Sequence, residues 1–413
     1  MDLLRFITAG SVDDGKSTLI GRLLYDTDSI KVDQLETIQR QSKNKQEGEI
    51  DLALFTDGLR AEREQGITID VAYKYFSTDK RKFIIADAPG HIQYTRNMVT
   101  GASNSDLIII LIDARQGVVE QTRRHSIIAS LLQIPHVVVT INKMDMVDYS
   151  EAAYNSIVDE YSRMAQTLNM KDIRFIPVSA LNGDNIVNSS PNTPWYTGQT
   201  LLDLLETIDV VRDLDFSESR FPVQYVIRPQ SDDLHDYRGY AGKVLSGSYK
   251  KGDKIIVLPD HIESEIEAVE VHGIEVEEAF APQSAVLRLK DDIDINRGDV
   301  IVTGSSAPIV SQEIEATLCW MDNKPLTAGG KYLLQVQSRR VRCIVKQINF
   351  KLDVNTLEKQ EGIEKASLND VVHVTIKTAS PIVYDTYTSL RANGGAILID
   401  ETANTTVAGL MLS

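Results

Sequence analysis

The stretch GSVDDGKST, Gly10–Thr18, determines how the rest of the chain is interpreted. Gly10, four further residues and then Gly15–Ser17 match the phosphate-binding loop pattern G-x-x-x-x-G-K-[ST]. Glycines let the backbone curl so that successive N–H groups converge on phosphate oxygens. A lysine adds a positive charge, and a hydroxyl can ligate Mg²⁺. We expect every residue of this loop to contact a nucleotide: Gly10, Ser11, Val12, Asp13, Asp14, Gly15, Lys16, Ser17 and Thr18.

The residues on either side of the loop fit this interpretation. Leu3–Ala9 is typical of a buried strand, and Ser17–Tyr25 is typical of an amphipathic helix that begins at the loop. The N-terminus of a helix favours anions because its first N–H groups are unpaired there. A glycine turn that matches the pattern by chance is the alternative, and the strand–loop–helix order argues against it.

Short apolar strands alternate with helices through the first half of the chain. This alternation predicts an α/β domain with a mostly parallel sheet and helices on both faces. The short link between Gly66–Phe76 and Lys82–Ala86 predicts an antiparallel pair of strands at one edge. The later segments are the strands Leu107–Asp113, His136–Ile141 and Ile173–Val178 and the helices Gln121–Leu132, Glu151–Leu168 and Thr200–Val211.

Ligands of such sheets bind at the carboxyl ends of the strands, and the motif DAPGH follows the strand Lys82–Ala86. We expect Asp87 to hold a metal ion through water and the N–H of Gly90 to reach a γ-phosphate. The nucleotide-contacting residues predicted here are Asp87, Ala88, Pro89, Gly90 and His91. By itself this short motif is most often a turn.

The motif NKMD follows the strand His136–Ile141. The carboxylate of Asp145 can accept hydrogen bonds from the guanine N1–H and exocyclic amine, which adenine does not supply. Asn142 can bond the base edge, and the stem of Lys143 can pack over the ring. Backbone N–H groups after the strand Ile173–Val178 can meet the guanine carbonyl oxygen. The predicted base-contacting residues are Asn142, Lys143, Met144, Asp145, Ser179, Ala180 and Leu181.

Thr68, in the segment EREQGIT, is a candidate for the part of the site that senses a triphosphate. Its hydroxyl can bind Mg²⁺, and its N–H can bind the γ-phosphate. Loops of this kind become ordered with the triphosphate and are released on hydrolysis. As the start of an alternating strand, Thr68 also has a purely structural interpretation. The expected metal-binding residues are therefore Ser17, Thr68 and, through water, Asp87.

From about residue 221, strands separated by Gly and Pro turns replace the alternation. Two sets of strands predict two β-barrels. We place the nucleotide domain at 1–215, the first barrel at 216–306 and the second at 307–413. The expected strands are Val223–Ile227, Gly239–Leu245, Lys254–Leu258, Glu265–His272, Ala285–Leu289 and Val300–Thr303, and then Glu313–Trp320, Tyr332–Val336, Val341–Ile348, Val371–Ile376 and Ala396–Ile399.

Composition limits the partners. The 413 residues carry a net charge of −16, shared by both halves, so we expect no nucleic acid partner. The longest apolar run, Leu107–Ile112, is too short to span a bilayer, and the N-terminus has no signal-peptide pattern. Cys319 and Cys343 are predicted to be buried free thiols. We expect a cytoplasmic protein that does not bind membranes.

Longer stretches identify a family. They include Thr56–Tyr73 (TDGLRAEREQGITIDVAY), Gly90–Ser103 (GHIQYTRNMVTGAS), Leu111–Ser126 (LIDARQGVVEQTRRHS) and Asp236–Gly247 (DYRGYAGKVLSG). With these stretches, nearly the whole chain resembles the GTPase subunits of bacterial heterodimeric ATP sulfurylases, also called sulfate adenylyltransferases. That family lies within the translational GTPase class of elongation factor Tu. An elongation factor shares the nucleotide motifs and the overall plan, but not these stretches in this form.

The resemblance implies a domain that binds GTP, GDP and Mg²⁺, followed by two barrels. It implies that GTP hydrolysis is coupled to adenylylsulfate synthesis from ATP and sulfate on a separate small catalytic subunit. It implies that His91 orients the attacking water, with Val12 and Ile67 as an apolar gate. Ala88 and Ile92 depart from the usual Thr and Glu of the family. No second phosphate loop follows, so we expect no fused adenylylsulfate kinase domain.

Two other functions stay open at this point. One is an elongation-factor-like translational GTPase, which ribosome-stimulated hydrolysis and a basic surface on the barrels would indicate. The other is a phosphate-loop kinase or ATPase. The NKMD motif argues against the latter, and nucleotide competition distinguishes it.

Overall fold

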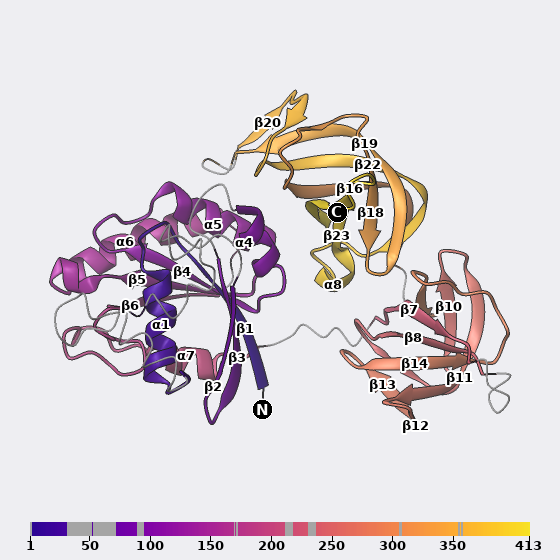
Figure 1. The fold of residues 1–413 in the computed structure, drawn as a ribbon, viewed down its shortest axis with the longest axis horizontal. Helices are drawn as coiled ribbons and strands as arrows, with labels where there is room; N and C mark the ends of the chain where they lie inside the picture. The colour runs from indigo at the N-terminus through magenta and orange to yellow at the C-terminus, as the bar shows by residue number, and fades with distance from the viewer. Residues whose placement is uncertain are drawn as a thin grey trace. The chain divides into compact units, whose positions relative to one another are not determined.

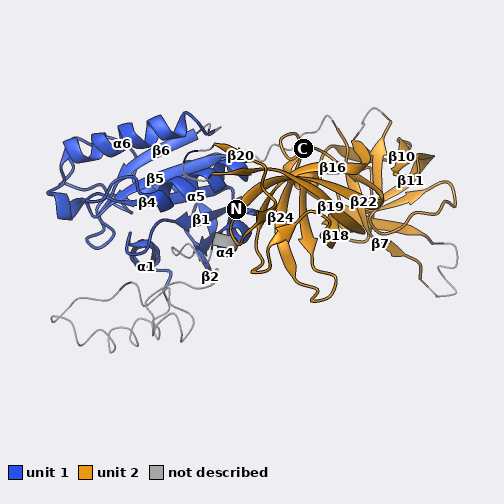
Figure 2. Cartoon of the chain, turned by 90° about the horizontal axis from the view of Figure 1, so that it is seen from above, with its two compact units in different colours: residues 1–210, 354–357 blue, residues 211–353, 358–413 orange. Residues whose placement is uncertain are grey.

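A computed structural model describes residues 2–30, 52, 72–88, 95–168, 170, 172–210, 218–229, 237–304, 308–353, 356 and 358–413 (Figure 1). The chain forms two compact units (Figure 2). Unit 1 comprises residues 1–210 with 354–357, and unit 2 comprises residues 211–353 with 358–413.

The described part of unit 1 contains a six-stranded sheet in the order β2-β3-β1-β4-β5-β6. Strands β3, β1, β4, β5 and β6 run parallel, and β2 pairs antiparallel with β3 at the edge, as predicted. The strands are β1 (Asp2–Ala9), β2 (Ala72–Ser77), β3 (Arg81–Asp87), β4 (Leu107–Asp113), β5 (His136–Asn142) and β6 (Asp172–Pro177). The helices are α1 (Lys16–Asp26), α4 (Thr95–Ala102), α5 (Glu120–Leu131), α6 (Glu151–Ala165) and α7 (Leu201–Thr207), with the 3-10 helix η4 (Met144–Val147) after β5.

The apolar run in β4 explains why helices cover both faces of the sheet. Every residue of β4 is buried, which requires cover on each side. Leu19 and Leu23 of α1 and Leu204 of α7 belong to one core cluster with Phe6 and Leu111 from the strands. Helix α4 contacts β1 and β3, and α5 contacts β4. Figure 2 shows α1 and α6 on opposite sides of the sheet.

Two helices are shorter than the sequence pattern predicts. Helix α6 ends at Ala165, and α7 ends at Thr207 because the backbone of Ile208 is extended, with ψ of 128°. Their starts follow from side-chain caps. The hydroxyls of Ser150 and Thr200 accept hydrogen bonds from backbone N–H groups in the first turns.

Unit 2 contains two antiparallel barrels, which confirms the predicted fold class. The first closes through β10-β15-β7-β8-β14-β11, with β11 pairing back to β10 and β12 added at β11. The second closes through β18-β23-β24-β16-β22-β19, with β19 pairing back to β18 and β20 added at β19. Each barrel encloses its own apolar core, and Cys319 and Cys343 are buried free thiols, as predicted. The domain borders at 215 and 306 stay predictions.

The strands of the first barrel are β7 (Phe221–Ile227), β8 (Gly239–Lys243), β9 (Ser248–Lys250), β10 (Lys254–Leu258), β11 (Ile262–Val271), β12 (Ile274–Val276), β13 (Glu278–Phe280), β14 (Ser284–Leu289) and β15 (Val300–Thr303). Those of the second barrel are β16 (Ile309–Trp320), β17 (Leu326–Thr327), β18 (Lys331–Val336), β19 (Arg339–Leu352), β20 (Lys359–Glu361), β21 (Lys365–Ala366), β22 (Val371–Tyr384), β23 (Gly395–Ile399) and β24 (Thr406–Leu412), with the short helix α8 (Arg391–Gly394).

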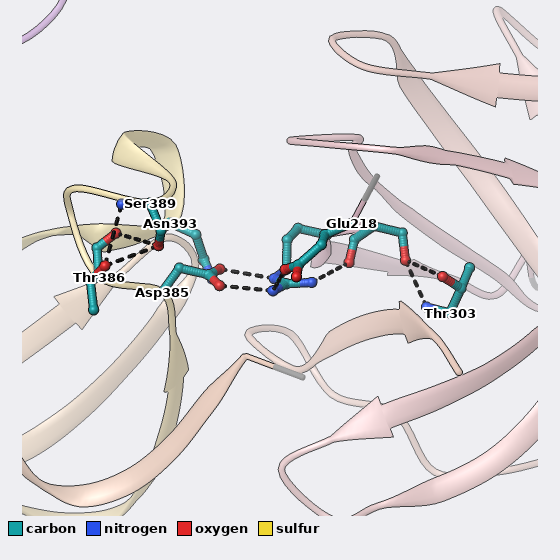
Figure 3. Close-up of polar contacts among 8 residues, drawn as sticks. Glu218, Thr303, Asp385, Thr386, Ser389 and Asn393 are labelled. Atoms are coloured by element: carbon teal, nitrogen blue, oxygen red, sulfur yellow. Dashed lines mark hydrogen bonds and ion pairs between the residues drawn. The ribbon is translucent and has the colours of Figure 1, made fainter. Parts of the chain in front are cut away.

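A buried ion pair joins the two barrels (Figure 3). Arg220, just before β7, donates two hydrogen bonds of 2.8 Å to the carboxylate of Asp385, just after β22. Asn393 donates a third hydrogen bond to Asp385, also 2.8 Å long, and Glu218 accepts from the same guanidinium at 2.7 Å. The Arg220 side chain is 1% exposed. Charges removed from water in this way are stable only while each retains its partners.

We predict that Arg220→Met lowers the free energy of unfolding of unit 2 by about 3–5 kcal/mol, because Asp385 stays buried without its counter-charge. Urea unfolding followed by the fluorescence of Trp320, in a Trp195→Phe background, measures this quantity for unit 2. The control is Arg340→Met, which removes an exposed arginine bonded to Gln335 and should change stability by less than about 0.5 kcal/mol. Equal stability of the two variants would contradict the role of the ion pair.

Candidate functional site

The predicted motifs gather at one edge of the unit 1 sheet. The carboxyl ends of the parallel strands β1, β3, β4, β5 and β6 meet there, so residues distant in sequence become neighbours. The structure brings together the phosphate-binding loop, Asp87, Ala88, the NKMD motif and the loop Ser179–Leu181. Thr68, Pro89, Gly90 and His91 lie outside the described residues, as do Ile67 and Ile92.

The phosphate-binding loop presents unpaired N–H groups at the start of α1. Within the described residues, the backbone N–H groups of Gly15, Lys16, Ser17 and Thr18 make no hydrogen bond. Gly15 has φ of 91°, and a Cβ there would lie 2.5 Å from Nδ2 of Asn142. Glycine is therefore needed at this position both for the backbone conformation and for the space. Donors arranged like this at a helix start favour an anion.

Lys16 lies across the loop with its charge already in place. Its Nζ donates to the carbonyl oxygens of Gly10 at 3.0 Å and Ser11 at 2.7 Å, and the residue is 7% exposed. Burial lowers the pKa of this ammonium, and the carboxylates of Asp87 and Asp14 act against that shift. The positive charge is thus held inside the loop by backbone carbonyls and nearby carboxylates.

The carboxylates beside Lys16 differ in their surroundings. Asp14 is buried and accepts a hydrogen bond from the Ser11 N–H. Burial raises the pKa of Asp14, although Lys16 and the Ser11 N–H act in the opposite direction. Asp87, at the end of β3, accepts a hydrogen bond of 3.0 Å from the hydroxyl of Thr8 on β1. The Ala88 N–H donates to the Thr8 carbonyl at 3.2 Å, which ties the chain after β3 to β1.

Asn142 joins the phosphate-binding loop to the loops that we assigned to the base. Its Nδ2 donates to the Asp14 carbonyl at 2.7 Å, and its Oδ1 accepts from the Ala180 N–H at 2.9 Å. The contacts of Asn142 and Ala180 with the base, expected from the sequence, stay predictions, and in this structure the two groups bond each other. Leu181 is different, because its N–H makes no hydrogen bond within the described residues.

The remaining NKMD side chains divide into buried and available groups. Lys143 donates to the Asp13 carbonyl and, at 2.9 Å, to the carboxylate of Asp113. Met144 is fully buried and serves the core. The Asp145 carboxylate makes no hydrogen bond or ion pair in the part of the chain that the structure describes. Asp145 therefore remains available to a ligand.

Sequence reasoning missed Asp113, the residue that positions Lys143. Its carboxylate, at the end of β4, also binds Arg115 at 2.6 and 3.0 Å. Burial alone would raise its pKa, but the hydrogen bonds from Arg115 and Lys143 hold the pKa of Asp113 well below its usual range. Its place at the end of a predicted parallel strand, beside the other motifs, was the available signal.

Comparisons with known proteins identify the family. Residues 1–212 match the elongation factor Tu GTP binding domain, and residues 313–412 match the GTP-eEF1A C-terminal domain-like family. A sulfate adenylyltransferase subunit 1 of Bacteroides fragilis is 50% identical over 414 residues, covering 100% of this chain and 86% of that protein. One of Shewanella oneidensis is 51% identical over 416 residues, covering 99% and 85%. The bifunctional enzyme CysN/CysC of Mycobacterium tuberculosis is 50% identical over 411 residues, covering 99% and 67%.

The chain belongs to the sulfate adenylyltransferase subunit 1 family. This confirms the family resemblance inferred from the sequence. The match of residues 1–212 shows that the chain has a GTPase domain of the elongation factor Tu type. None of the helices in the described ranges combines the length and apolar character needed to cross a membrane.

His125 is a buried residue that the sequence analysis did not single out. It lies on α5, is 2% exposed, and its Nδ1 has no hydrogen-bond partner within the described residues. Burial lowers the pKa of His125 to about 3, and the positive charges of Lys16 and Arg124 add to that effect. The imidazole is therefore neutral in the folded protein at ordinary pH.

We predict that His125 makes unit 1 less stable in mild acid. The pKa of His125 is lower in the folded state than in the unfolded chain. Below about pH 6.5, His125 therefore binds a proton in the unfolded chain but stays neutral in the native state. Stability should fall by about 1.4 kcal/mol per pH unit between pH 6 and 4 through this group. Urea unfolding followed by Trp195, in a Trp320→Phe background, should show this loss for the parent and a shallower dependence for His125→Gln. The control is His272→Gln, which removes an exposed histidine. Parallel pH profiles for parent and His125→Gln would refute the prediction.

Proposed function

We propose that the protein binds GTP·Mg²⁺ in unit 1, hydrolyses it, and uses hydrolysis to drive adenylylsulfate formation on a separate small subunit. The observation that carries this proposal is the set of unpaired N–H groups at Gly15–Thr18 with the Lys16 charge beside them. A polyanion satisfies those donors at once, and the family supplies the identity of the nucleotide.

The phosphate end of the proposed site uses the whole loop Gly10–Thr18. The Ser17 hydroxyl makes no hydrogen bond within the described residues, so it is available as an oxygen ligand for Mg²⁺. Asp87 would hold the ion through water, and Thr68 would bind it in the triphosphate state. Bound there, Mg²⁺ neutralises charge on the β- and γ-phosphates.

The base end reads guanine through Asp145 and the Ser179–Leu181 loop. The Asp145 carboxylate faces two donors on guanine, N1–H and the exocyclic amine. The unpaired N–H of Leu181 is the donor that we assign to the guanine carbonyl oxygen. The Lys143 stem, held by Asp113, packs over the ring.

Hydrolysis is assigned to His91, which would orient the attacking water, with Val12 and Ile67 as an apolar gate. Val12 is 37% exposed in the phosphate-binding loop. A histidine that positions water by hydrogen bonding accelerates the step without contributing to nucleotide affinity.

Coupling follows from the chemistry of the product. ATP and sulfate give adenylylsulfate and pyrophosphate, and the new phosphate–sulfate anhydride is readily hydrolysed, so synthesis is uphill. A protein whose GTP and GDP states bind a partner with different affinity can transfer free energy to that reaction. The relatives named subunit 1 support a partner subunit. An elongation-factor-like role remains the alternative, and the net charge of −16 does not favour a tRNA partner.

We predict that Asp145→Asn weakens GTP binding by about 1–3 kcal/mol, the usual range for a bidentate contact to a base edge. The same variant should gain affinity for xanthosine triphosphate, whose C2 oxygen accepts from the new amide. The control is Asp148→Asn, the same substitution at an exposed position of the same turn. Competition binding with both nucleotides measures the effect. Unchanged GTP affinity in Asp145→Asn would remove the guanine assignment.

We predict that adding the small subunit with ATP and sulfate increases GTP turnover. His91→Ala should bind GTP normally, hydrolyse it about 10²–10⁴-fold more slowly and lower adenylylsulfate yield in parallel. The measurement is GTP turnover with and without the small subunit, beside adenylylsulfate yield. No effect of the subunit, or stimulation by ribosomes instead, would replace the sulfate assignment with the translational GTPase.

A further inference from the structure

Tyr149 links the two loops assigned to the guanine base. It follows η4, and its N–H donates to the Met144 carbonyl at 2.8 Å, closing the turn that contains Asp145. Its hydroxyl donates to the carboxylate of Asp184 at 2.7 Å and accepts from Asn182 Nδ2 at 3.2 Å. Tyr149 therefore belongs to one loop through its backbone and to the other through its side chain.

Asp184 closes the second loop. Its N–H donates to the Ser179 carbonyl at 3.2 Å, and its carbonyl accepts from the Ser179 N–H at 3.3 Å, so Ala180 and Leu181 lie within a closed turn. Its carboxylate also accepts from the Ser190 hydroxyl at 2.5 Å. The bond from Tyr149 thus reaches a carboxylate that is already fixed to the loop backbone.

The hydroxyl of Tyr149 stays a donor over the physiological range. Burial raises its pKa, and the hydrogen bond to Asp184 raises the pKa further. A neutral phenol donating to a carboxylate is a charge-assisted hydrogen bond, which is stronger than a neutral one. The link between the loops is therefore not a weak surface contact.

Arg22 holds the same loop from the side of α1. Its guanidinium donates to the carbonyl of Ala180 at 3.3 Å and to the carbonyl of Leu181. In a trans peptide the carbonyl and the next N–H point in opposite directions. The bond to the Ala180 carbonyl consequently turns the Leu181 N–H away from Arg22. The loop is therefore held both by Arg22 and by the Tyr149–Asp184 bond.

We propose that Tyr149, through Asp184, is a positioning residue that sets selectivity for guanine. Guanine presents its carbonyl oxygen, N1–H and exocyclic amine on one edge. The Leu181 N–H must therefore contact the oxygen while the Asp145 carboxylate contacts the two donors. The Tyr149–Asp184 bond fixes the spacing between the two turns that carry those groups. The inference rests on the proposed GTP site. It adds the residues that keep the Leu181 N–H and the Asp145 carboxylate at the right distance from each other.

The test compares GDP with inosine diphosphate, which lacks the exocyclic amine. Tyr149→Phe and Asp184→Asn should each lower the ratio of GDP to inosine diphosphate affinity by about threefold to tenfold, which is less than the whole value of a charged hydrogen bond because this bond acts on the base only through the two loops. Tyr149→Phe removes the bond, and Asp184→Asn removes the charge of its acceptor, so the double variant should lose no more than Tyr149→Phe alone. Tyr154→Phe is the matched control, since it removes a tyrosine hydroxyl on α6 that donates to the Phe175 carbonyl on β6.

Thermal unfolding of each variant separates positioning from stability. A lowered melting temperature with an unchanged affinity ratio in both single variants would overturn the proposal, as would additive losses in the double variant. If Tyr149→Phe does not fold, Asp184→Asn carries the same comparison. Asp145→Asn distinguishes the two levels of inference. An affinity ratio unchanged in Asp145→Asn refutes the guanine site itself, whereas a ratio changed only in Asp145→Asn refutes the positioning role alone.

Discussion

The side-chain amide of Asn142 holds the site together. One end donates to the Asp14 carbonyl of the phosphate-binding loop, and the other accepts from the Ala180 N–H. These three residues are far apart in the sequence, and they meet because parallel strands deliver their following loops to one edge. A side-chain amide donates through its nitrogen and accepts through its oxygen, and an aspartate here would place an oxygen against the Asp14 carbonyl. The phosphate end and the base end are thereby parts of a single arrangement.

An acidic chain can nevertheless receive a polyanion, because its charges are organised locally. Lys16 is buried, and the carboxylates of Asp87, Asp14 and Asp13 favour its charged form. The unpaired N–H groups at the start of α1 add oriented dipoles beside that charge. Both act on a phosphate at short range, where they matter more than the overall charge of −16.

The sequence was sufficient for the mostly parallel sheet with its antiparallel edge pair, for the two barrels and for the motifs at the strand ends, because periodicity and strand-end motifs are local patterns. It was not sufficient for Asp113, Tyr149 and Asp184, whose roles arise only from tertiary contacts. Tyr149, for example, sits in an ordinary polar turn, and nothing nearby in the chain predicts its bond to Asp184. The strand β24 was missed because its sequence, TVAGLML, is an almost continuous apolar run that does not alternate with polar residues. The roles of Thr68 and His91 remain predictions from the motif alone.

The ion pair between Arg220 and Asp385 has a consequence for how this chain can be divided. Sequence families treat residues 313–412 as a unit of their own, and the second barrel has its own apolar core. Yet a fragment cut between the barrels would leave the carboxylate of Asp385, together with Asn393, facing solvent where a guanidinium had been. The two barrels therefore depend on each other for this buried ion pair. Recombination that exchanged only the second barrel would also have to supply a matching arginine at the start of the first.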